Sequence, residues 1–478
     1  RTAIQPTREQ DFPEWYQQVI KAADLAENSP VRGSMIIKPY GWAIWENMQK
    51  IFDGWLKDYG VQNASFPLLI PVSFLAKEAE HVEGFAKECA VVTHHRLEAD
   101  GKGGLKPASP LEEPYVVRPT SETIIGDAMS RWIQSYRDLP LQLNQWCSVM
   151  RWEMRTRIFL RTSEFFWHEG HNAFEDHQGA KGDCLHVLGL YEKFFREVLA
   201  FSGYQGVKTP EERFPGANET YAFEAMMQDG KSLQAATTHD LGTNFAKSCN
   251  IKYQDRQGVE QYAHTTSWAF STRVIGGLIM MHGDDDGMIM PPRIAPQQVV
   301  VLPVIKDDSA AAVNEFCKKL GDRIKQAGFT VKVDTRDMRT PDKMWDAVKK
   351  GIPLRVEVGQ REMEAGQVTT VRRDLGKESK QTISADQFIE TLPAILDDIH
   401  NSMYKRSDTF LRANTFEGTS ILDLQNFFSD KNKIGFVKVP VELLKDAKLE
   451  AVKKEHGLSS RVMPFEDEGR KVIIGKAY

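Results

Sequence analysis

The sequence predicts a mixed α/β protein with more than one domain. Stretches with helical periodicity alternate with β-branched apolar runs along the chain, as in folds that contain both helices and sheets. A chain of 478 residues is also too long for a single hydrophobic core, so we expect two to four domains. The pattern of apolar and polar residues changes after Pro291-Pro292-Arg293. We therefore place the first domain boundary between residues 1–293 and 294–403.

Residues 1–293 are expected to form the largest domain. Apolar residues at helical spacing predict an amphipathic helix from Trp42 to Tyr59. It leads into a predicted strand at Asn63–Pro67, continued by Leu-Leu-Ile-Pro71. The charged, glycine-bearing stretch Glu88–Glu113 is predicted to be a mobile loop. The apolar run Val274–Met281 is predicted to be a buried strand, with a helix as the alternative.

Residues 294–403 have the alternation of a βαβ unit, which predicts a separate α/β domain on a parallel or mixed sheet. Its predicted elements are a strand at Gln298–Ile305, a helix capped by Asp308 or Ser309 and ended by Gly328, and strands at Phe329–Asp334 and Leu354–Gly359. Helical pieces and a terminal strand beginning at Lys471 predict a third, small α/β module over residues 404–478.

Composition excludes several classes of protein. The net charge of -5 means that any nucleic-acid contact must use a local basic patch. No apolar run approaches the ~18 residues of a membrane helix, and the first thirty residues lack a signal-peptide pattern. The first residue is Arg rather than Met, so we expect the natural start upstream. Five scattered cysteines without a CxxC pair argue against a disulfide framework and fit a reducing, cytoplasmic location.

The most informative stretch is the run RWEMRTRIFLRTSEFFWHEGH, from Arg151 to His171. Its four arginines, Arg151, Arg155, Arg157 and Arg161, fall within eleven residues and alternate with Glu153, Glu164 and aromatic residues. The planar guanidinium fork matches phosphate oxygens in bidentate fashion, so this density suits a polyphosphate site. A solvated basic hairpin without special purpose is the alternative, because charge runs usually lie at the surface.

Two further segments favour the first interpretation. One is Arg118-Pro-Thr-Ser-Glu122, and the other is Thr265-Thr-Ser-Trp-Ala-Phe-Ser-Thr-Arg273, followed by His282-Gly-Asp-Asp285. Together with the arginine run they resemble the three signature motifs of class II aminoacyl-tRNA synthetases: motif 1 ending at Pro67, motif 2 as Arg151-Trp-Glu153 and motif 3 ending at Arg273. The surrounding sequence strings (RPTSE, LRTSEFFWHEGH, HGDDDGMIMPPR) are similar to those of the prolyl-tRNA synthetases of the archaeal and eukaryotic type. This resemblance covers the whole chain.

The resemblance implies a fold and an activity. The fold is a class II catalytic core on an antiparallel sheet (1–293), an anticodon-binding domain (294–403) and a small C-terminal module (404–478). The activity is formation of prolyl-adenylate from L-proline and ATP, followed by transfer of proline to proline tRNA. Joining a carboxylate to the α-phosphate of ATP is an in-line attack, so catalysis is mainly positioning and charge neutralisation.

Roles for individual residues follow from the resemblance. Arg151 and Arg273 are the implied catalytic residues: Arg151 bridges the α-phosphate and the proline carboxylate, and Arg273 covers the adenine and reaches phosphate. The implied ATP contacts are completed by Glu153 on the adenine amino group, Phe165 stacked on the ring, Arg161 and Thr162 on the phosphate side, and Gln234 and Thr237. Without the motif, core packing would be the simpler interpretation of Phe165 and Trp167.

The implied proline pocket has to hold a charged secondary ammonium, which needs acceptors or a counter-charge when buried. In the family pattern the Thr120 hydroxyl and the Glu122 carboxylate supply them, and Arg151 holds the carboxylate. Trp167, Glu169 and His171 form the wall of the pocket, with His239 nearby. A Thr-x-Glu pair alone is a weak signal, and only the accompanying motifs give it weight.

A local basic surface is expected between Arg336 and Arg373, where nine basic residues outnumber six acidic ones. Within it Lys343, Asp346 and Arg355 are the candidates to contact anticodon bases, because such side chains can bond the Watson–Crick edge of splayed bases. Asp346 stands where the resemblance leads us to expect the longer Glu. A solvated face of an α/β domain is the alternative for each of the three.

Two metal-like patterns are dismissed. In His168-Glu169-Gly170-His171 the histidines are three apart rather than four, which does not fit a helical zinc protease motif. Asp284-Asp285-Asp286-Gly287 lacks the glutamate of a calcium loop, so we interpret it as a turn that leads into the last strand of the catalytic sheet. The C-terminal module has no cysteine after Cys317, whereas archaeal-type relatives often bind zinc there through four. No zinc or other protein-bound metal is expected.

Further expectations concern editing and assembly. The 93 residues between His171 and Thr265 are too few for the editing domain of bacterial-type relatives plus the core strands. The resemblance also implies a homodimer built on motif 1, and ATP bound with Mg²⁺. Two alternatives remain: a paralogue that makes an adenylate for another acceptor, against which the retained Arg336–Arg373 region speaks, and a catalytically silent tRNA-binding subunit.

Overall fold

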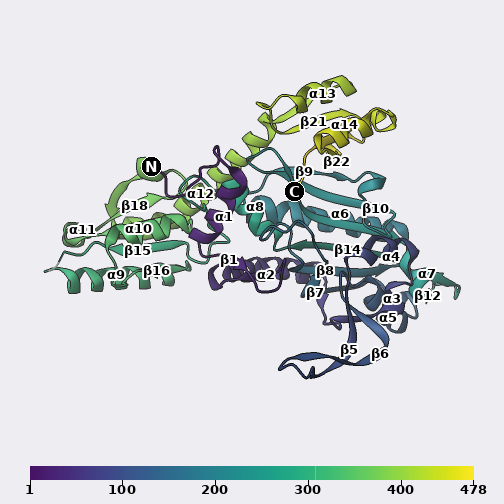
Figure 1. The fold of residues 1–478 in the computed structure, drawn as a ribbon. Coiled ribbons are helices and arrows are strands. Elements are labelled where there is room, and N and C mark those ends of the chain that lie inside the picture. Colours follow the sequence, from purple (N-terminus) through teal and green to yellow (C-terminus); the bar gives the residue numbers. More distant parts are fainter. Residues whose placement is uncertain (307) are drawn as a thin grey trace.

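The structure is a computed structural model that describes residues 1–306 and 308–478. A long, mainly antiparallel sheet runs through the body of the molecule (Figure 1), in the order β20-β21-β23-β22-β9-β10-β11-β14-β8-β7-β3. Only the outer pairs β20/β21 and β3/β7 are parallel. The antiparallel core expected for residues 1–293 is therefore confirmed.

The strands of this long sheet come from distant parts of the chain. Their bounds are β3 (Gln62–Asn63), β7 (Leu141–Met150), β8 (Glu164–Phe174), β9 (Gly203–Val207), β10 (Glu219–Met226), β11 (Ser232–Gly242), β14 (His264–Ser271), β20 (Thr415–Glu417), β21 (Phe436–Pro440), β22 (Ser459–Pro464) and β23 (Lys471–Gly475). Two small ribbons accompany it, β1 (Ala26–Asn28) with β2 (Met35–Ile37) and β12 (Lys252–Gln254) with β13 (Glu260–Tyr262).

Helices cover the catalytic part of the sheet. Aromatic rings from α2 and α6 pack on β14: Phe270 lies 5.1 Å from Phe52 and 5.4 Å from Phe194, centroid to centroid. The helix predicted over Trp42–Tyr59 is confirmed as α2, which begins earlier because Pro39 fits the first turn of a helix. The helices of this part are α1 (Phe12–Ala22), α2 (Pro39–Tyr59), α3 (Val72–Leu75), α4 (Ala79–Phe85), α5 (Glu122–Trp132), α6 (His177–Glu197), α7 (Asn244–Cys249) and α8 (Arg273–His282).

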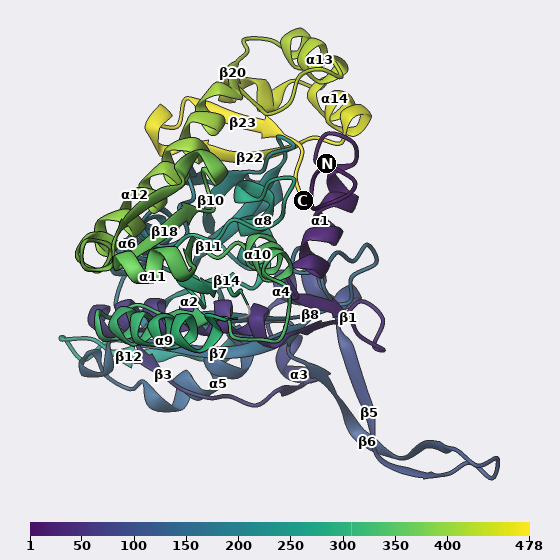
Figure 2. The same ribbon diagram turned by 90° about the vertical axis from the view of Figure 1, so that its left-hand side faces the viewer.

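The prediction of a loop over Glu88–Glu113 was wrong. This segment forms most of a long hairpin, β5 (Ala90–Ala99) and β6 (Leu105–Val117), which pairs with β4 (Leu69–Pro71) at its base and projects from the body (Figure 2). The Asp100 carboxylate closes the tip by accepting the backbone N–H groups of Lys102 and Gly104. Charged residues obscured the strand pattern, because both faces of the ribbon are largely exposed.

Two other predictions in this part need correction. The run Val274–Met281 is the helix α8 rather than a strand; a helix buried on all sides has no amphipathic period, so periodicity could not separate the two. The turn Asp284–Gly287 does not lead into a further strand of the long sheet, since the next strand belongs to another sheet. The strand expected at Asn63–Pro67 ends at Asn63.

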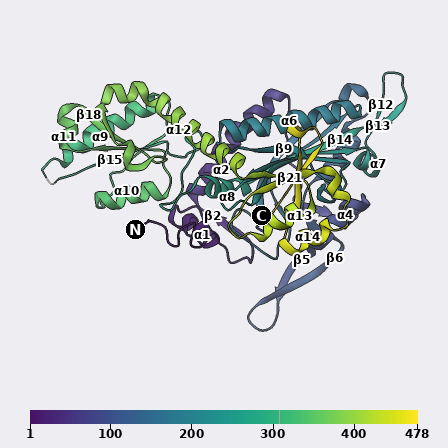
Figure 3. The same ribbon diagram turned by 90° about the horizontal axis from the view of Figure 1, so that it is seen from above.

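Residues 294–403 include a five-stranded sheet to one side of the core (Figure 3). β15 pairs in parallel with β16 and β17, and β18 and β19 add antiparallel edges. The predicted mixed sheet is confirmed, and the predicted helix begins directly after Ser309. The elements are β15 (Val299–Pro303), α9 (Ala310–Gln326), β16 (Val331–Val333), α10 (Thr340–Lys349), β17 (Leu354–Val358), α11 (Gln360–Ala365), β18 (Gln367–Arg372), β19 (Gln381–Ser384) and α12 (Ala385–Ala413).

The C-terminal residues extend the long sheet instead of forming a detached unit. The predicted boundary between residues 403 and 404 lies inside α12, and β22 pairs with β9 of the catalytic part. Arg461 of β22 also donates to the buried Glu224 at 3.1 Å, and the same carboxylate pairs with the buried Lys208. The helices here are α13 (Ile421–Ser429) and α14 (Leu449–His456). No helix of the described residues could cross a membrane.

Candidate active site

A cavity of about 200 Å³ opens on the antiparallel sheet among α5, β8, β11 and β14. All the residues predicted for proline line it, and so do five of those predicted for ATP. The shared set is Thr120, Glu122, Arg151, Phe165, Trp167, Glu169, His171, Gln234, Thr237, His239 and Arg273. Segments up to about 150 residues apart in the sequence thus meet at one site.

An acidic end of the cavity is formed where α5 begins. Glu122 is the first residue of this helix and is only 5% exposed. The Thr120 hydroxyl donates to its carboxylate at 2.5 Å. The partial positive charge at a helix N-terminus favours a carboxylate there. The pair offers a buried anion and a hydroxyl oxygen, which are groups that can receive an ammonium.

Glu169 on β8 is the most heavily bonded side chain of the site. Its carboxylate accepts hydrogen bonds from the Ser121 hydroxyl at 2.9 Å, Gln145 at 3.1 Å and Trp167 at 3.2 Å, and its Oε1 lies 2.5 Å from His171 Nε2. Burial opposes the charge, but the adjacent His171 and the hydrogen bonds outweigh it and lower the pKa of Glu169 to about 2. Glu169 therefore orients the wall of the pocket.

The two histidines of the site have opposite properties. Burial alone would lower the pKa of His171, but the Glu169 carboxylate overcomes this and raises it. Burial, with Arg151 nearby, lowers the pKa of His239 to about 3, so His239 is neutral at physiological pH. Thr220 and Thr237 hold its two ring nitrogens at 3.0 and 3.1 Å. His171 can carry charge, whereas His239 is a fixed polar wall.

Arg151 lies at the end of β7 and points into the cavity. Its Nε donates to the Pro119 carbonyl at 2.9 Å, and its terminal nitrogens make no hydrogen bond to the residues that the structure describes. The guanidinium carbon lies 4.9 Å from the ring centre of Phe85 and 5.3 Å from that of Trp167. Burial lowers the pKa of Arg151, and nearby glutamates partly offset this. A positioned cation thus faces the cavity.

Arg273, the first residue of α8, lies on the side of β11. Its Nε donates to the Leu160 carbonyl at 3.2 Å and its Nη1 to the Gln234 carbonyl at 3.4 Å. Burial, together with Arg161 and Arg151 nearby, lowers its pKa to about 10. Two arginines that repel one another in one cavity are suited to an anion such as a phosphate.

Three predicted ATP residues lie outside the cavity lining. Glu153, Arg161 and Thr162 belong to the connection between β7 and β8, where Arg161 pairs with Glu153 at 3.6 Å. The Thr162 hydroxyl donates its proton to the Glu164 carbonyl at 2.7 Å, so only its oxygen can take part in a further hydrogen bond, as an acceptor. Contact with a nucleotide remains a prediction for all three.

The chain end reaches the same neighbourhood. Tyr478 N–H donates to the Ser232 carbonyl at 3.0 Å, and Ser232 N–H donates to the Lys476 carbonyl at 2.8 Å. The Arg157 guanidinium lies 5.6 Å from the centre of the Tyr478 ring. The terminal residues therefore lie along β11, two positions before Gln234.

The candidate anticodon residues lie on the five-stranded sheet and α10. Lys343 is 3% exposed, and its ammonium donates to the Asp334 carbonyl at 3.0 Å. Asp346 accepts from Arg336 at 2.9 Å, and Arg355 pairs with Glu357 at 3.0 Å. A base that approaches Lys343 would have to draw its side chain out of this position.

Several lining residues were missed by sequence reasoning. The connection between β9 and β10 supplies Glu212, Arg213 and Phe214, and the Phe214 ring stacks on His239 with centroids 4.4 Å apart. This connection has no periodic pattern, and its residue types are ordinary for a surface loop. The other missed residues are Thr220, Ala235, Ala236, Ser267, Trp268, Ala269, Phe270 and Ser271.

The histidine pattern His168-Glu169-Gly170-His171 has a structural role other than metal binding. His168 lies on a strand and is fully buried between Tyr191, at 2.9 Å, and Asn144, at 2.8 Å. Burial lowers the pKa of His168 to about 3. Within residues 1–306 and 308–478, no group of three or more histidines, cysteines or acids is arranged to hold a metal ion.

Comparison with known proteins gives two matching family models. Residues 105–282 match the tRNA synthetase class II core domain (G, H, P, S and T), and residues 298–395 match an anticodon binding domain. The first range contains every lining residue of the cavity. The second lies within the five-stranded sheet and the helices around it.

Curated relatives match over nearly the whole chain. A proline--tRNA ligase from Bdellovibrio bacteriovorus is 52% identical over 447 residues, which cover 92% of this chain and 90% of that protein. Those of Akkermansia muciniphila and Paramagnetospirillum magneticum are 50% and 49% identical, and the alignments cover 98% and 100% of this chain and 95% and 99% of those proteins. At this identity and coverage, with the class II core built around the cavity, the chain belongs to the proline--tRNA ligase family of class II aminoacyl-tRNA synthetases.

Proposed function

We propose that the cavity binds L-proline and ATP together and joins them as prolyl-adenylate, and that the proline then passes to proline tRNA. One observation supports this assignment to the cavity: the buried carboxylate of Glu122 and the half-buried guanidinium groups of Arg151 and Arg273 line the same space. An amino acid needs an anion for its ammonium, whereas its carboxylate and a nucleotide phosphate need cations.

Proline lies at the acidic end in this proposal. Its ammonium donates to the Glu122 carboxylate and the Thr120 hydroxyl, and Arg151 receives its carboxylate. Trp167, with Phe214 stacked on the neutral His239, gives the ring an uncharged aromatic wall. Because Thr120 and Glu122 are already bonded to each other, they hold this arrangement before the substrate enters.

ATP lies between Phe165 and Arg273, with Gln234 and Thr237 beside it. Arg151 contacts both substrates, so it neutralises the charge that develops when the proline carboxylate attacks the α-phosphate. Glu153, Arg161 and Thr162 contact the nucleotide from the connection between β7 and β8 in this proposal. Mg²⁺ enters bound to the phosphates of ATP, as the charge of the nucleotide requires, and no metal-ligand set is assigned to the protein.

The test of this function is proline-dependent exchange of labelled pyrophosphate into ATP. We expect strong exchange with proline and none with threonine, because threonine presents a primary ammonium and a branched polar side chain to the proline slot. Folded protein that supports no exchange with proline, alanine, cysteine or threonine would remove the enzyme assignment and favour the tRNA-binding alternative.

Alanine is expected to be activated as a weak competitor. It lacks two carbons of the proline ring, and each missing methylene gives only ~1–3 kcal/mol of discrimination. The two together correspond to about thirtyfold to twenty-five-thousandfold in kcat/KM. The pyrophosphate exchange rates with alanine and proline measure the ratio, and discrimination well above the upper value would contradict this prediction. Because the 93 residues between His171 and Thr265 are too few for an editing domain, we also expect no hydrolysis of alanyl-tRNA by this chain.

The remaining assignments concern tRNA and assembly. The match of residues 298–395 to an anticodon binding domain supports anticodon contacts near Lys343, Asp346 and Arg355. A homodimer through the motif 1 region, a cytoplasmic location and the archaeal and eukaryotic architecture are part of the same proposal. Two features support that architecture: only 93 residues separate His171 from Thr265, and the C-terminal module is joined to the catalytic sheet. The relatives described above are bacterial. The C-terminal module, without zinc cysteines, is held by packing and by Arg461.

A further inference from the structure

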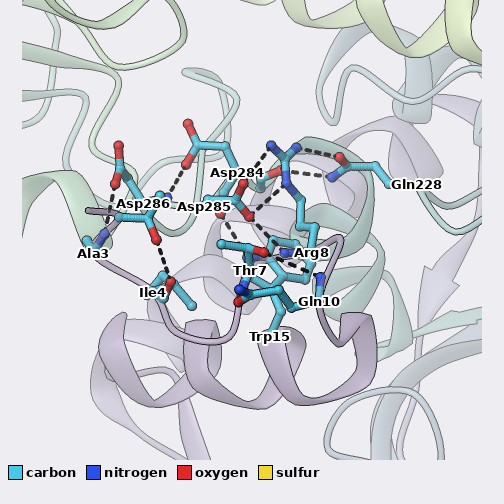
Figure 4. Close-up of polar contacts among 12 residues, drawn as sticks. Ala3, Ile4, Thr7, Arg8, Gln10, Trp15, Gln228, Asp284, Asp285 and Asp286 are labelled. Atoms are coloured by element: carbon cyan, nitrogen blue, oxygen red, sulfur yellow. Dashed lines mark hydrogen bonds and ion pairs between the residues drawn. The ribbon is translucent and has the colours of Figure 1, made fainter.

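The three consecutive acids Asp284, Asp285 and Asp286 follow α8 and bind three different partners. Asp285 accepts from Arg8 at 3.1 Å and Asp286 from the backbone N–H of Ala3 at 2.9 Å (Figure 4). The Asp284 carboxylate accepts hydrogen bonds from both terminal nitrogens of Arg373, at 2.6 and 2.8 Å. Arg373 lies directly after β18, in the range that matches an anticodon binding domain. The turn thus ties that range to the catalytic part.

The same contact region closes the C-terminal end of α10. A helix leaves its last four carbonyls without intrahelical partners. Here Val348 accepts from Arg373 Nε at 2.8 Å, and Lys350 accepts from the Tyr40 hydroxyl at 2.9 Å. The carbonyls of Lys349 and Gly351 accept from the backbone of Met288 at 3.1 Å and Met290 at 3.0 Å. Four consecutive carbonyls, the last two of the helix and the two that follow it, therefore accept from Arg373 and the catalytic part.

The fit is close as well as polar. Gly351 has φ +71°, and a Cβ on it would lie 2.5 Å from the Met288 carbonyl oxygen. Arg373 and Asp284 are partly shielded from solvent, with side-chain exposures of 6% and 32%, so their ion pair is screened less than a surface pair. We call the set of Asp284, Met288, Met290, Tyr40, Arg373 and carbonyls 348–351 the α10 joint.

The joint lies between two functional ends. The helix α10 carries Lys343 and Asp346, which are candidates for anticodon contact. Asp284 is two residues beyond the end of α8, whose first residue is Arg273. One tRNA must contact both ends at once. When two contacts are linked, the effective concentration of the second depends on how rigidly and at what spacing the two sites are held.

We propose that the α10 joint, through the Asp284–Arg373 pair, positions the anticodon-binding part so that a bound anticodon delivers the acceptor end of the same tRNA to the active site. Asp284 and Arg373 are positioning residues in this scheme, since neither lines the cavity. The inference rests on the proposed function. It differs from that proposal in its prediction: weakening the joint affects tRNA charging and leaves proline activation intact.

The variant to make is Asp284→Asn, assayed with two full-length proline tRNA transcripts, one with the native anticodon and one with a substituted anticodon. We expect roughly a tenfold loss of kcat/KM for the native transcript. The substituted transcript, which gains little from the anticodon contact, should change little, so the advantage of the native anticodon shrinks. Proline-dependent pyrophosphate exchange should stay at the wild-type rate, which also shows that the catalytic part is folded.

The change in charge caused by Asp284→Asn would by itself have the opposite effect. Removal of a negative charge near a tRNA surface favours the binding of phosphate, so it would strengthen tRNA binding and not weaken it. Gly351→Ala, which changes shape without changing charge, should give the same selective loss. Arg373→Gln combined with Asp284→Asn should cost no more than the larger single effect, because both remove one interaction. Asp397→Asn is the control: it breaks the exposed Arg293–Asp397 pair, at 3.2 Å, which also links the two parts.

Three outcomes would overturn the proposal. Equal losses with both transcripts, or a parallel loss of pyrophosphate exchange, would make the joint a general support of the catalytic part. Unchanged charging of both transcripts would make it dispensable. Wild-type protein without proline-dependent exchange would instead reject the proposed function itself, and the two failures are therefore distinguishable.

Discussion

Replacing Arg273 by alanine is expected to reduce proline-dependent pyrophosphate exchange about a thousandfold. Its half-buried guanidinium lies near Arg151 and donates to the carbonyls of Leu160 and Gln234, so it is fixed before the nucleotide arrives. A preorganised cation loses little energy to reorganisation when charge moves onto the phosphate oxygens. The loss should appear mainly in kcat, because the interaction strengthens as the charge develops.

Binding of tRNA separates this prediction from a general loss of structure. Arg273 lies inside the cavity, away from the anticodon-binding range, so Arg273→Ala should bind proline tRNA nearly as tightly as the wild type in a filter-binding assay. Arg256→Ala is the matched control, since that side chain is 66% exposed and its ion-pair distance to Glu175 is 3.8 Å. An Arg273→Ala protein that keeps normal exchange would contradict the assignment of the catalytic arginine.

Glu169→Gln is expected to lower the free energy of unfolding by about 3–5 kcal/mol, because it removes the charge of one partner in a buried ion pair. It should also raise KM for proline, since Trp167 and His171 bond different oxygens of Glu169 and glutamine keeps only one acceptor oxygen. Glu164→Gln is the control, because Glu164 lies on the same strand and is exposed. Urea unfolding at fixed pH measures the difference. Equal stability of the two variants would contradict the prediction.

The pH dependence of stability gives a second test of the pair. The folded pKa of His171 is raised above its ordinary value of ~6.5. Its contribution is therefore complete below about pH 6.5 and is lost as the pH rises through the folded pKa. The contribution of Glu169 is present above about pH 4.3 and is lost as the pH falls towards its folded pKa of about 2.

In Glu169→Gln the slope around pH 6.5 should change sign. Burial would then act on His171 without the Glu169 charge and lower its folded pKa below the unfolded value. Stability would rise with pH up to the unfolded pKa of ~6.5 and then level off, whereas in the wild type the contribution of His171 falls. Unfolding measured in steps from pH 5 to pH 8 gives the two slopes. Parallel slopes would show that Glu169 does not control the protonation of His171.

Much of the architecture was predictable from local pattern. The helix α2 and the alternating elements after residue 298 have one polar and one apolar face, so their periods are visible in the sequence. The hairpin β5–β6 was missed because both of its faces are largely exposed. The helix α8 was missed because it is buried on every side. A segment whose surroundings are uniform carries no periodic signal.

The candidate site divides in a similar way. Short strings such as Arg118-Pro-Thr-Ser-Glu122 identified residues that line the cavity because their chemistry is concentrated in a few positions. Phe214 and Thr220 could not be found in this way. Phe214 acts by stacking on His239, and Thr220 by holding its ring nitrogen, and neither contact has a local pattern.

The sequence by itself determined the family, the reaction class and charged residues that line the cavity, because those depend on residue types at short spacing. Only the tertiary structure decided how the charges are balanced: that side chains of five residues hydrogen-bond the Glu169 carboxylate, that the C-terminal module continues the catalytic sheet, and that Asp284 pairs with Arg373. These depend on contacts between positions up to about 250 residues apart. Burial sets the strength of each contact, and burial is a property of the folded chain.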